Sequence, residues 1–418
     1  MSITAIIAFL IVFGLLVSFH EFGHFIVAKK CGVLVREFAI GMGPKIFAWI
    51  KHDTAYTIRL LPVGGYVRMA SEEDHDELDP GQRLLLQLDD KGAVNRIDLR
   101  VDQEEAGFLF QVDQADLVDQ LILSGFRVGS EDKTEFAVSP QAIIVDDNGQ
   151  EARVAPRASW VESASAPKRV AINLAGPLMN FVLAIVAALT LAFSLSQVSV
   201  NEPVLGQVEK SQPAAQAGLK ANDRIESVNG QKVEHFTDFA ELVTAQKGQV
   251  MTIQYRRDGR VMTTKVQAVE TTVSGQKAYR IGVLAKGETG FLDRLHYAWM
   301  MCSSWFTQVF NGIVNLFSTT FSLNKIGGPV MLAKATSTAT NQGFLTVLAL
   351  LGMLSVNLGL VNLLPIPPLD GGKVFLDLYE SIFRRPFPKV LSTGLIMVGT
   401  VALIVLMVLV TANDLIHF

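Results

Sequence analysis

The feature that most constrains this chain is a set of long apolar runs that contain no charge. Residues 3–19 carry no charged side chain and the apolar character resumes at 25–28; further runs occupy residues 170–195, 344–364 and 390–410. At ~1.5 Å of rise per helical residue, such a run can cross the ~30 Å hydrocarbon core of a bilayer. Because lipid offers a peptide group no hydrogen-bond partner, these runs must be helical. We predict four transmembrane helices.

The formal net charge of −4 hides an uneven distribution of charge. Residues 71–167 carry 22 acidic and 8 basic side chains, whereas the rest of the chain has a net charge of +10. The positive charges flank the apolar runs and form no basic face, so we predict no nucleic-acid partner. The chain is therefore predicted to be a membrane protein with an acidic soluble insert, and the lipid bilayer is its first predicted partner.

The basic residues also predict the orientation of the spans, because Lys and Arg cluster on the cytoplasmic side of a membrane. Basic residues follow the first run, precede the second and lie between the third and fourth: Lys29, Lys30, Lys168, Arg169, Arg384 and Arg385. With four spans, all of these lie on one side. The prediction is a multi-pass protein with both termini extracytoplasmic and the acidic insert cytoplasmic.

One further segment leaves the span count open. Residues 295–323 contain no side chain of fixed charge, but polar residues such as Ser303, Gln308 and Asn311 dilute their apolar character. Either a fifth span or an amphipathic helix at the membrane interface fits this composition.

The segments between the apolar runs have patterns typical of β-structure. Residues 38–69 combine β-branched patches with several glycines, which predicts short strands joined by turns, and residues 72–162 predict a small β-rich acidic domain. Residues 204–284 are more regular. They predict a strand at 205–208, a helix at 213–217, a hairpin turn at Asn229-Gly230, a helix at 236–245, and strands at 250–256 and 261–269.

The first apolar run leads into the sequence His20-Glu21-Phe22-Gly23-His24. Positions i and i+4 of a helix share one face, so both imidazoles can bind one metal ion with Glu21 beside them. Zinc lowers the pKa of its bound water to about 7, and a neighbouring glutamate can take the proton. Three ionisable groups within a membrane helix are costly unless they serve a purpose, which favours a metal site over a structural role.

A catalytic zinc ion needs a third protein ligand and one open position. Asp370 is the candidate, because it follows the third run in the segment Asn362-Leu-Leu-Pro-Ile-Pro-Pro-Leu-Asp370. The prolines forbid a regular helix, and irregular backbone at membrane depth is tolerated only where it is buried in protein or lines a wet cavity. A metal shared with His24 requires four spans, so residues 295–323 become an interfacial helix. Two histidines and one carboxylate suit zinc best but not uniquely.

Together these motifs resemble the site-2 protease family (M50), in its bacterial branch of the RseP, RasP and Eep type. The resemblance covers nearly the whole chain, including the Leu174-Ala-Gly-Pro-Leu-Met-Asn180 segment that opens the second run. It implies zinc (Zn2+) ligation by His20, His24 and Asp370, with Glu21 as the catalytic base that activates water.

The resemblance further implies that Asn357 and Asn362 contact the substrate, although either amide could equally satisfy the broken helix backbone. The implied activity is that of a zinc metalloendopeptidase of the bacterial cell membrane, which performs regulated intramembrane proteolysis. Its implied partners are single-span membrane proteins or peptides, such as pre-trimmed anti-sigma factors and signal-peptide remnants. Residues 38–69 resemble the family's membrane-dipping β-sheet, whose open edge could pair with an unwound substrate.

The module at 204–284 resembles a PDZ domain of the bacterial protease-associated kind. A single such module and a long acidic insert fit the Gram-positive RasP and Eep branch, whereas RseP-type enzymes carry two tandem modules. The module is expected to bind exposed peptide ends or to exclude bulky ectodomains by size, and packing on the core is its structural alternative.

The predicted fold is a polytopic α-helical membrane protein with membrane-associated β-strands, a cytoplasmic β-rich insert and an extracytoplasmic α+β PDZ-like domain. Its predicted segments are transmembrane helix 1 (1–30), the membrane-associated β-sheet (31–70), the acidic insert (71–167), transmembrane helix 2 (168–195), the PDZ-like domain (200–286), the interfacial helix (290–325), transmembrane helix 3 with the Asp370 motif (343–372) and transmembrane helix 4 (390–412).

Two other classes of function compete with a protease. Intramembrane His, Glu and Asp also mark the ion paths of transporters, but the chain has no inverted repeat, and a glutamate beside a histidine on one helix favours hydrolysis. A scaffold with an inert metal site would need to have lost a catalytic residue, and all four are present.

Overall fold

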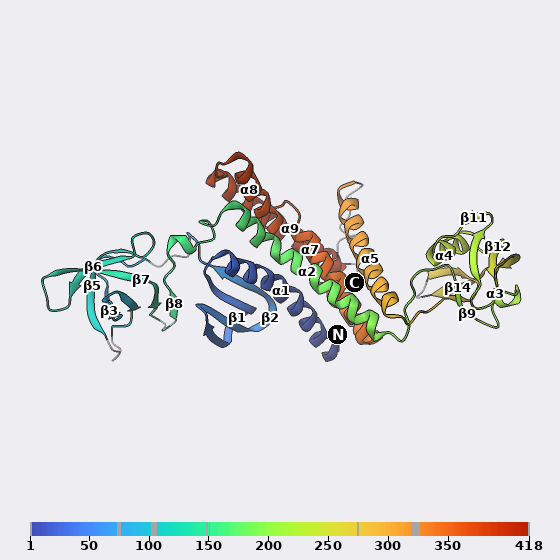
Figure 1. Ribbon diagram of the computed structural model, residues 1–418, viewed down its shortest axis with the longest axis horizontal. Coiled ribbons are helices and arrows are strands. Elements are labelled where there is room, and N and C mark those ends of the chain that lie inside the picture. The colour runs from blue at the N-terminus through green and yellow to red at the C-terminus, as the bar shows by residue number, and fades with distance from the viewer. Residues whose placement is uncertain are drawn as a thin grey trace. The chain divides into compact units, whose positions relative to one another are not determined.

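The computed structural model describes residues 2–72, 77–101, 107–147, 149, 151–273, 276–318 and 327–416. The chain divides into two compact units (Figure 1). One consists of Met1–Ala184 and Phe306–Phe418, and the other of Ile185–Trp305. The first unit contains His20, His24 and Asp370, and the second contains the module predicted to resemble a PDZ domain.

Four helices in the described part of the chain are long and apolar enough to cross a membrane. They are α1 (Ile3–Cys31), α2 (Ala166–Ser194), α7 (Phe344–Asn362) and α9 (Lys389–Ile416), and they coincide with the four predicted runs. Helix α5 (Phe291–Ser318) covers the described part of the uncertain segment and is not among the four. Residues 319–325 of the predicted interfacial helix lie outside the described residues.

Helix α1 has a sequence signal at each end. The Ser2 hydroxyl accepts a hydrogen bond from the backbone N–H of Ala5 at 3.2 Å, and Gly32 ends the helix with a φ of 86°. Lys29 and Lys30 lie in the last turn, where positive charge complements the helix dipole. The two metal-binding candidates therefore lie on a helix whose ends are well defined.

Strands β1 (Val35–Lys51) and β2 (Thr54–Met69) form a two-stranded antiparallel sheet that packs beside α1 (Figure 1). The prediction of several short strands joined by turns is confirmed within these two long elements. Residues 37–40 pair with 65–68 and also with 55–58, whereas residues 47–51 pair with 54–58 across the reversal at His52-Asp53. Gly41, Gly43 and Gly64 lie inside the long strands with φ angles of 89°, 86° and 84°. Gly41 and Gly43 lie between the paired segments 37–40 and 45–51, and Gly64 directly precedes the paired segment 65–68, so these glycines mark the turns at which the chain reverses.

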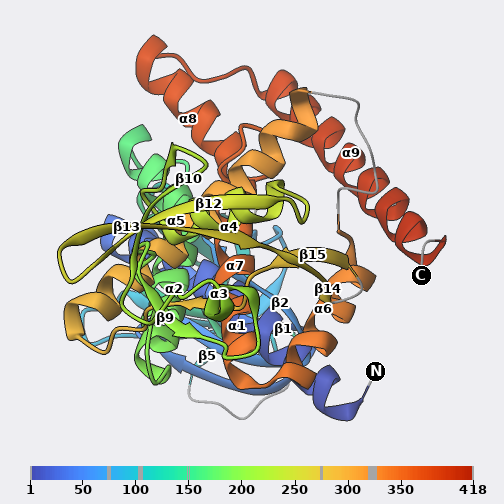
Figure 2. The same ribbon diagram turned by 90° about the vertical axis from the view of Figure 1, so that its right-hand side faces the viewer.

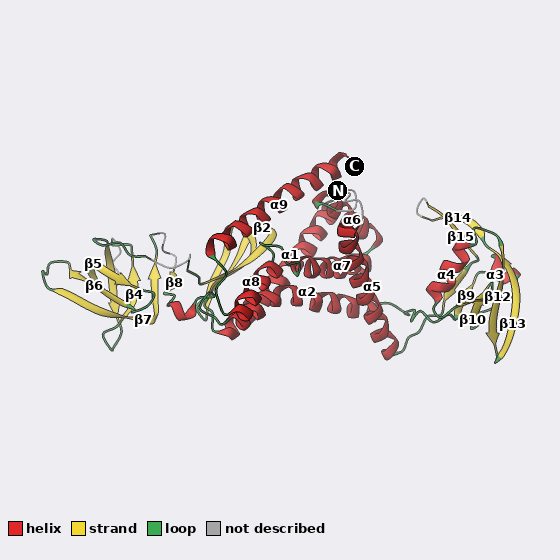
Figure 3. Ribbon diagram, turned by 90° about the horizontal axis from the view of Figure 1, so that it is seen from above, coloured by secondary structure: helices red, strands yellow, loops and turns green. Residues whose placement is uncertain are grey.

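The predicted β-rich acidic domain is a six-stranded sheet in the order β4-β3-β5-β6-β7-β8, drawn as yellow strands in Figure 3. Strand β4 also pairs in parallel with β7, which closes the sheet on itself around a core that includes Leu84, Ile97 and Phe110. The strands are β3 (Arg83–Leu88), β4 (Val94–Asp98), β5 (Phe108–Asp116), β6 (Ile122–Arg127), β7 (Lys133–Val145) and β8 (Glu151–Arg153). A 3-10 helix, η1 (Arg157–Ser159), follows before α2.

The second unit contains the elements that the sequence predicts between residues 204 and 284, and it faces the viewer in Figure 2. Asn229 and Gly230, with φ angles of 49° and 83°, form the predicted hairpin turn. The sheets are ordered β11-β10-β12-β13, β16-β9 and β14-β15. The elements are β9 (Leu205–Val208), α3 (Pro213–Gln216), β10 (Arg224–Val228), β11 (Gln231–Lys232), α4 (Phe236–Ala245), β12 (Val250–Arg257), β13 (Arg260–Gln267), β14 (Val269–Val273), β15 (Gln276–Arg280) and β16 (Val283–Ala285).

Two helices of the first unit are not predicted by the sequence. Helix α6 (Pro329–Gln342) precedes α7, and helix α8 (Asp370–Phe383) begins directly after the proline-rich segment. The sequence gives little indication of either helix. Helix α6 is rich in Ser, Thr and Ala and so lacks a long apolar run, and α8 follows a strong helix-breaking signal.

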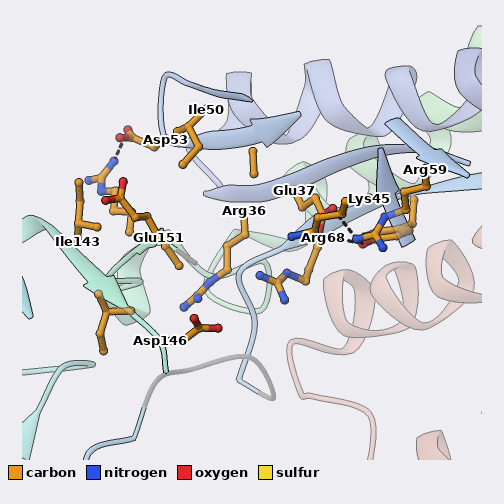
Figure 4. A pocket seen from close by; sticks show the side chains of 15 residues that line it. Arg36, Glu37, Lys45, Ile50, Asp53, Arg59, Arg68, Ile143, Asp146 and Glu151 are labelled. Carbon is orange, nitrogen blue, oxygen red and sulfur yellow. Dashed lines mark hydrogen bonds and ion pairs between the residues drawn. The ribbon is translucent and has the colours of Figure 1, made fainter. Parts of the chain in front are cut away.

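A charged cavity of about 580 Å3 lies between the β1–β2 sheet and strands β7 and β8 of the insert (Figure 4). Two of its acids are paired inside it. Glu37 accepts a hydrogen bond from Arg59 at 2.8 Å, and Asp53 of the sheet accepts one from Arg153 of the insert at 2.7 Å. The residues predicted to bind metal do not line this cavity. The Asp53–Arg153 pair joins the insert to the sheet, whereas the Glu37–Arg59 pair lies within the sheet.

Candidate metal centre

His20 and His24 lie one turn apart on α1, and both are buried. Their rings meet edge to face, with centroids 4.9 Å apart and planes inclined by 80°. The Nε2 atoms are 3.3 Å apart, so the two rings present the same nitrogen to one point. This arrangement follows directly from the i, i+4 spacing on a helix.

Asp370 approaches the histidines from a different part of the chain. It is the first residue of α8, and residues 363–369 between α7 and α8 form turns and no regular helix. Gly371 and Gly372 allow this approach: a Cβ at Gly372 would lie 2.5 Å from the backbone nitrogen of Pro367, and a Cβ at Gly371 would overlap the carbonyl oxygen of Leu363. The Asp-Gly-Gly sequence therefore lets the start of α8 fold against the proline-rich turns.

The structure brings three metal-binding atoms together. Asp370 Oδ2 lies 3.1 Å from His20 Nε2 and 3.2 Å from His24 Nε2. With the 3.3 Å separation of the two nitrogens, the three atoms form a nearly equilateral triangle. All three residues are at most 8% exposed.

The spacing of this triangle fits a tetrahedral metal ion. An ion bonded to each donor at about 2.0–2.1 Å holds neighbouring donors about 3.3 Å apart. If both Nε2 atoms carry lone pairs, three electron-pair donors converge in a buried place, which is unfavourable unless a cation lies among them. Asp370 Oδ2 also has no conventional hydrogen-bond partner in the described residues. Three protein donors leave a fourth position open, which is the pattern of a catalytic site.

The contacts of the two rings favour this use of Nε2. His24 Nδ1 lies 2.8 Å from the carbonyl oxygen of Ile172 on α2, so Nδ1 carries the proton and Nε2 carries the lone pair. His20 Nδ1 lies 3.1 Å from the amide of Asn180, whose Oδ1 is buried without another partner in the described residues. A half-turn of that amide, which exchanges its nitrogen and oxygen, gives Oδ1 the Nδ1–H donor that a metal-binding tautomer of His20 requires.

Small residues allow α1 and α2 to meet at this point. A Cβ at Gly23 would overlap the carbonyl oxygen of Ala175, and a Cβ at Gly176 would overlap His24 Nε2 and lie 2.8 Å from His20 Cε1. Helix α7 joins the same contact, because Ser355 Oγ donates to the backbone oxygen of Asn180 at 2.7 Å. The Ala-Gly-Pro segment of α2 is therefore the surface on which both histidine rings pack.

Glu21 lies between the metal-binding atoms and the β1–β2 sheet. It is within electrostatic range of His20, His24 and Asp370. Its Cγ would lie 3.7 Å from a Cβ built on Gly65 of β2.

The two predicted substrate-contacting asparagines lie on α7. Asn357 is exposed on the helix surface, and Asn362 is the last residue of the helix and is half-buried. Neither amide side chain makes a hydrogen bond to another described residue, so both keep donors and acceptors available. The structure does not bring them into contact with the three metal-binding atoms.

Sequence reasoning missed several contacts of the site. It identifies Asn180 only as part of a segment of small residues, it uses Arg169 only for membrane orientation, and it gives no role to Ile172 or Asp377. A buried asparagine within an apolar run was the available signal, because a polar side chain in a membrane helix requires a partner.

Comparison with known proteins gives one consistent result. Residues 8–406 match the family described as peptidase family M50. A protein of Enterococcus faecalis named "Probable protease eep" is 41% identical over 418 residues, which is 99% of each chain. "Zinc metalloprotease RasP" of Bacillus licheniformis is 37% identical over 98% of each chain, and "Regulator of sigma-W protease RasP" of Bacillus subtilis is 36% identical over 99% of each chain.

Proposed function

This chain belongs to peptidase family M50, and from that premise we propose that it is a zinc endopeptidase that cleaves its substrates within or near the membrane. The observation that carries the proposal is the triangle of buried donor atoms, with sides of 3.1, 3.2 and 3.3 Å. Residues distant in sequence supply it, and its two histidines lie on α1, which is apolar enough to span a bilayer.

His20, His24 and Asp370 are the proposed zinc ligands. Bound zinc supplies a Lewis acid that polarises a peptide carbonyl and makes water more acidic. Ile172 and Asn180 hold the histidine rings, and Gly176 leaves the space that the rings need.

Glu21 is the proposed general base. Its carboxylate takes a proton from the attacking water, whose oxygen forms the new bond to the scissile carbonyl carbon. When the carbon–nitrogen bond breaks, Glu21 returns the proton to the leaving amine. The products are a carboxylic acid and an amine, which ionise in water to a carboxylate and an ammonium group, and Glu21 ends the cycle as the carboxylate with which it began.

The β1–β2 sheet is the proposed platform for the substrate. A transmembrane helix hides its scissile bond in hydrogen bonds, so it must unwind before hydrolysis, and an open strand edge can pair with the unwound segment. The position of Glu21 beside Gly65 of β2 supports this route. Asn357 and Asn362 are proposed to donate hydrogen bonds to substrate carbonyl groups, because their amides are available.

The proposed substrates are single-span membrane proteins or peptides, such as pre-trimmed anti-sigma factors and signal-peptide remnants. The name of the Bacillus subtilis relative, a regulator of sigma-W, supports the first class. The PDZ-like module is proposed to bind exposed peptide ends or to exclude substrates with bulky ectodomains.

The chain is proposed to be a multi-pass protein of the bacterial cell membrane with both termini extracytoplasmic. The four spans and the basic residues at the ends of α1 and α2, including Lys29, Lys30 and Arg169, support this orientation. The segment boundaries given above, including the PDZ-like domain at 200–286, belong to the same proposal.

The experiment that tests this function is cleavage of a single-span model substrate by the purified full chain in detergent. We expect cleavage inside the span, sensitive to a zinc chelator, and lost by about 10²–10⁴-fold in Glu21→Gln with zinc retained. Glu241→Gln, the same substitution at an exposed position of α4, is the matched control and should cleave normally. Full cleavage by Glu21→Gln would exclude Glu21 as the base.

A further inference from the structure

A polar cluster joins α2 to α8 beyond the metal-binding atoms. It consists of Arg169 and Asn173 on α2 and Asp377 and Glu380 on α8, and we call it the α8 clamp. We propose that the α8 clamp is a positioning device that fixes Asp370 relative to the two histidines and thereby sets the affinity of the site for zinc. This inference rests on the proposed metal site and names residues that support it.

In the α8 clamp, both oxygens of the Asp377 carboxylate accept hydrogen bonds from α2. Arg169 Nε donates to Asp377 Oδ1 at 2.7 Å, and Asn173 Nδ2 donates to Asp377 Oδ2 at 2.9 Å. Arg169 Nη2 donates to Glu380 Oε2 at 2.5 Å. Two residues on α2 therefore fix the rotation and the axial position of α8 together.

Arg169 is itself held in place. Its Nη1 donates to the backbone oxygens of Ala164 at 2.8 Å and Glu162 at 3.2 Å, so the guanidinium uses all of its nitrogen atoms. The side chains of Arg169 and Asp377 are 13% and 12% exposed. A charge-assisted pair that is this well buried and this fully bonded has little freedom to slide.

Helix α8 transmits this restraint to Asp370. Asp370 is residue 1 of the helix and Asp377 lies seven residues later, a separation of about 10 Å along the axis, on nearly the same face. On its other side, Asp370 follows the irregular turns of residues 363–369. The regular element that holds the carboxylate is therefore α8, and the α8 clamp is what joins α8 to α2.

Helix α2 contacts both histidine rings and also holds α8, the helix that carries Asp370. Arg169, Asn173, Gly176 and Asn180 recur at spacings of three and four on α2, which places them along one face. Gly176 and Asn180 contact the histidine rings, and Arg169 and Asn173 hold α8. The same face of α2 therefore positions both the histidine rings and the helix that carries Asp370. Figure 1 shows α8 beside the beginning of α2.

The test is the zinc affinity of the full chain in detergent, measured by competition with a chelator of known affinity. The absorption spectrum of the cobalt-loaded protein gives a second readout, because it reports the geometry of the donors. Asp377→Asn removes the charge and keeps the shape of the side chain. Loss of a partner that orients a metal ligand typically weakens metal binding about 10- to 100-fold, and we expect a loss in this range with an altered cobalt spectrum.

Two variants provide the comparison. Asp377→Glu keeps the carboxylate, and we expect it to restore most of the affinity that Asp377→Asn loses. Asp223→Asn is the matched control, because Asp223 is also buried and accepts two hydrogen bonds from one arginine, Arg257, at 2.6 and 2.7 Å in the other unit. We expect Asp223→Asn to leave zinc affinity unchanged.

Unchanged affinity and cobalt spectrum in Asp377→Asn would overturn the inference, as would an equal loss in Asp223→Asn. If Asp377→Asn does not fold, Glu380→Gln takes its place, and a smaller loss in the same direction is expected because Glu380 is the more exposed carboxylate. Zinc binding that survives His24→Ala would instead reject the proposed metal site, which separates failure of that proposal from failure of the α8 clamp.

Discussion

Two buried carboxylates, one in each compact unit, differ in what surrounds them. Asp223 in the second unit is fully buried, and its carboxylate faces hydrogen-bond donors: Arg257 donates to both oxygens, and the backbone N–H of Lys220 donates at 2.7 Å. Asp370 in the first unit directs Oδ2 at two imidazole nitrogens that are themselves electron-pair donors.

The comparison separates a structural carboxylate from a ligand. A buried carboxylate that faces N–H groups is satisfied by the protein alone, so its effect is on stability. A buried carboxylate that faces other lone pairs needs a cation to complete its surroundings, so its effect is on metal binding. Four variants test this contrast, and they follow in order of decreasing expected effect.

The largest effect is expected for Asp370→Ala. Removal of a ligand should weaken zinc binding by more than the about 100-fold limit that applies to a supporting residue. Metal content after dialysis, measured by atomic absorption, checks this. Zinc occupancy equal to that of the unmodified chain would remove Asp370 from the ligand set and would make the two carboxylates alike.

Asp223→Asn should show the opposite pattern. Breaking a buried ion pair leaves Arg257 without its charge partner, which costs about 3–5 kcal/mol. Thermal unfolding of the full chain, followed by a probe in the second unit, should shift down while zinc content stays constant. Arg224→Gln, which breaks an exposed ion pair with Glu202 in the same unit, is the control and should change stability by less than about 1 kcal/mol. Loss of zinc in Asp223→Asn would contradict the contrast.

Gly176→Ala tests how tightly the histidines are held. The added methyl group overlaps His24 Nε2, and a displacement of about 1 Å at a reacting centre can cost about 10²-fold in rate. The rate of cleavage of the model substrate is the measurement. Gly394→Ala in α9, where a Cβ would meet no atom within 4 Å, is the matched control. Equal rates for the two variants would show that the rings tolerate movement.

The smallest effect is expected for Glu37→Gln, and the loss of stability that it causes should depend on pH. Burial raises the pKa of this carboxyl, but hydrogen bonds from Thr57, Arg59 and Tyr66 outweigh burial and hold the pKa below its usual range. Like Asp223, Glu37 faces donors, so Glu37→Gln should cost about 1.5–3 kcal/mol at neutral pH and leave zinc in place.

The sign of the pH dependence follows from the lowered pKa. The contribution of Glu37 to stability is fully present above the unfolded value, about 4.3, and is lost as the pH falls through the folded value. The difference in stability between Glu37→Gln and the unmodified chain should therefore be constant from pH 7 to about pH 5 and shrink below that. A difference that stays constant down to pH 3 would show that the charge of Glu37 contributes nothing.

The limits of prediction from the sequence are visible in particular elements. The helices α1, α2, α7 and α9 and most of the second unit follow the sequence closely, because apolar length and turn signals such as Asn229-Gly230 act locally. The short strands predicted at 38–69 are also present, but the sequence does not give their pairing: only the structure shows that residues 37–40 pair with both 55–58 and 65–68.

The amino-acid sequence alone predicts the spans, the pairing of His20 with His24, and Asp370 as the candidate third ligand. Each of these depends on transfer free energy, on the period of a helix or on the chemistry of one side chain. The distances between the three donor atoms, the contacts of Gly176 and Asn180 with the histidine rings, and the α8 clamp are seen only in the folded structure. Those depend on how closely α1, α2 and α8 approach, and side chains far apart in sequence fix that distance together.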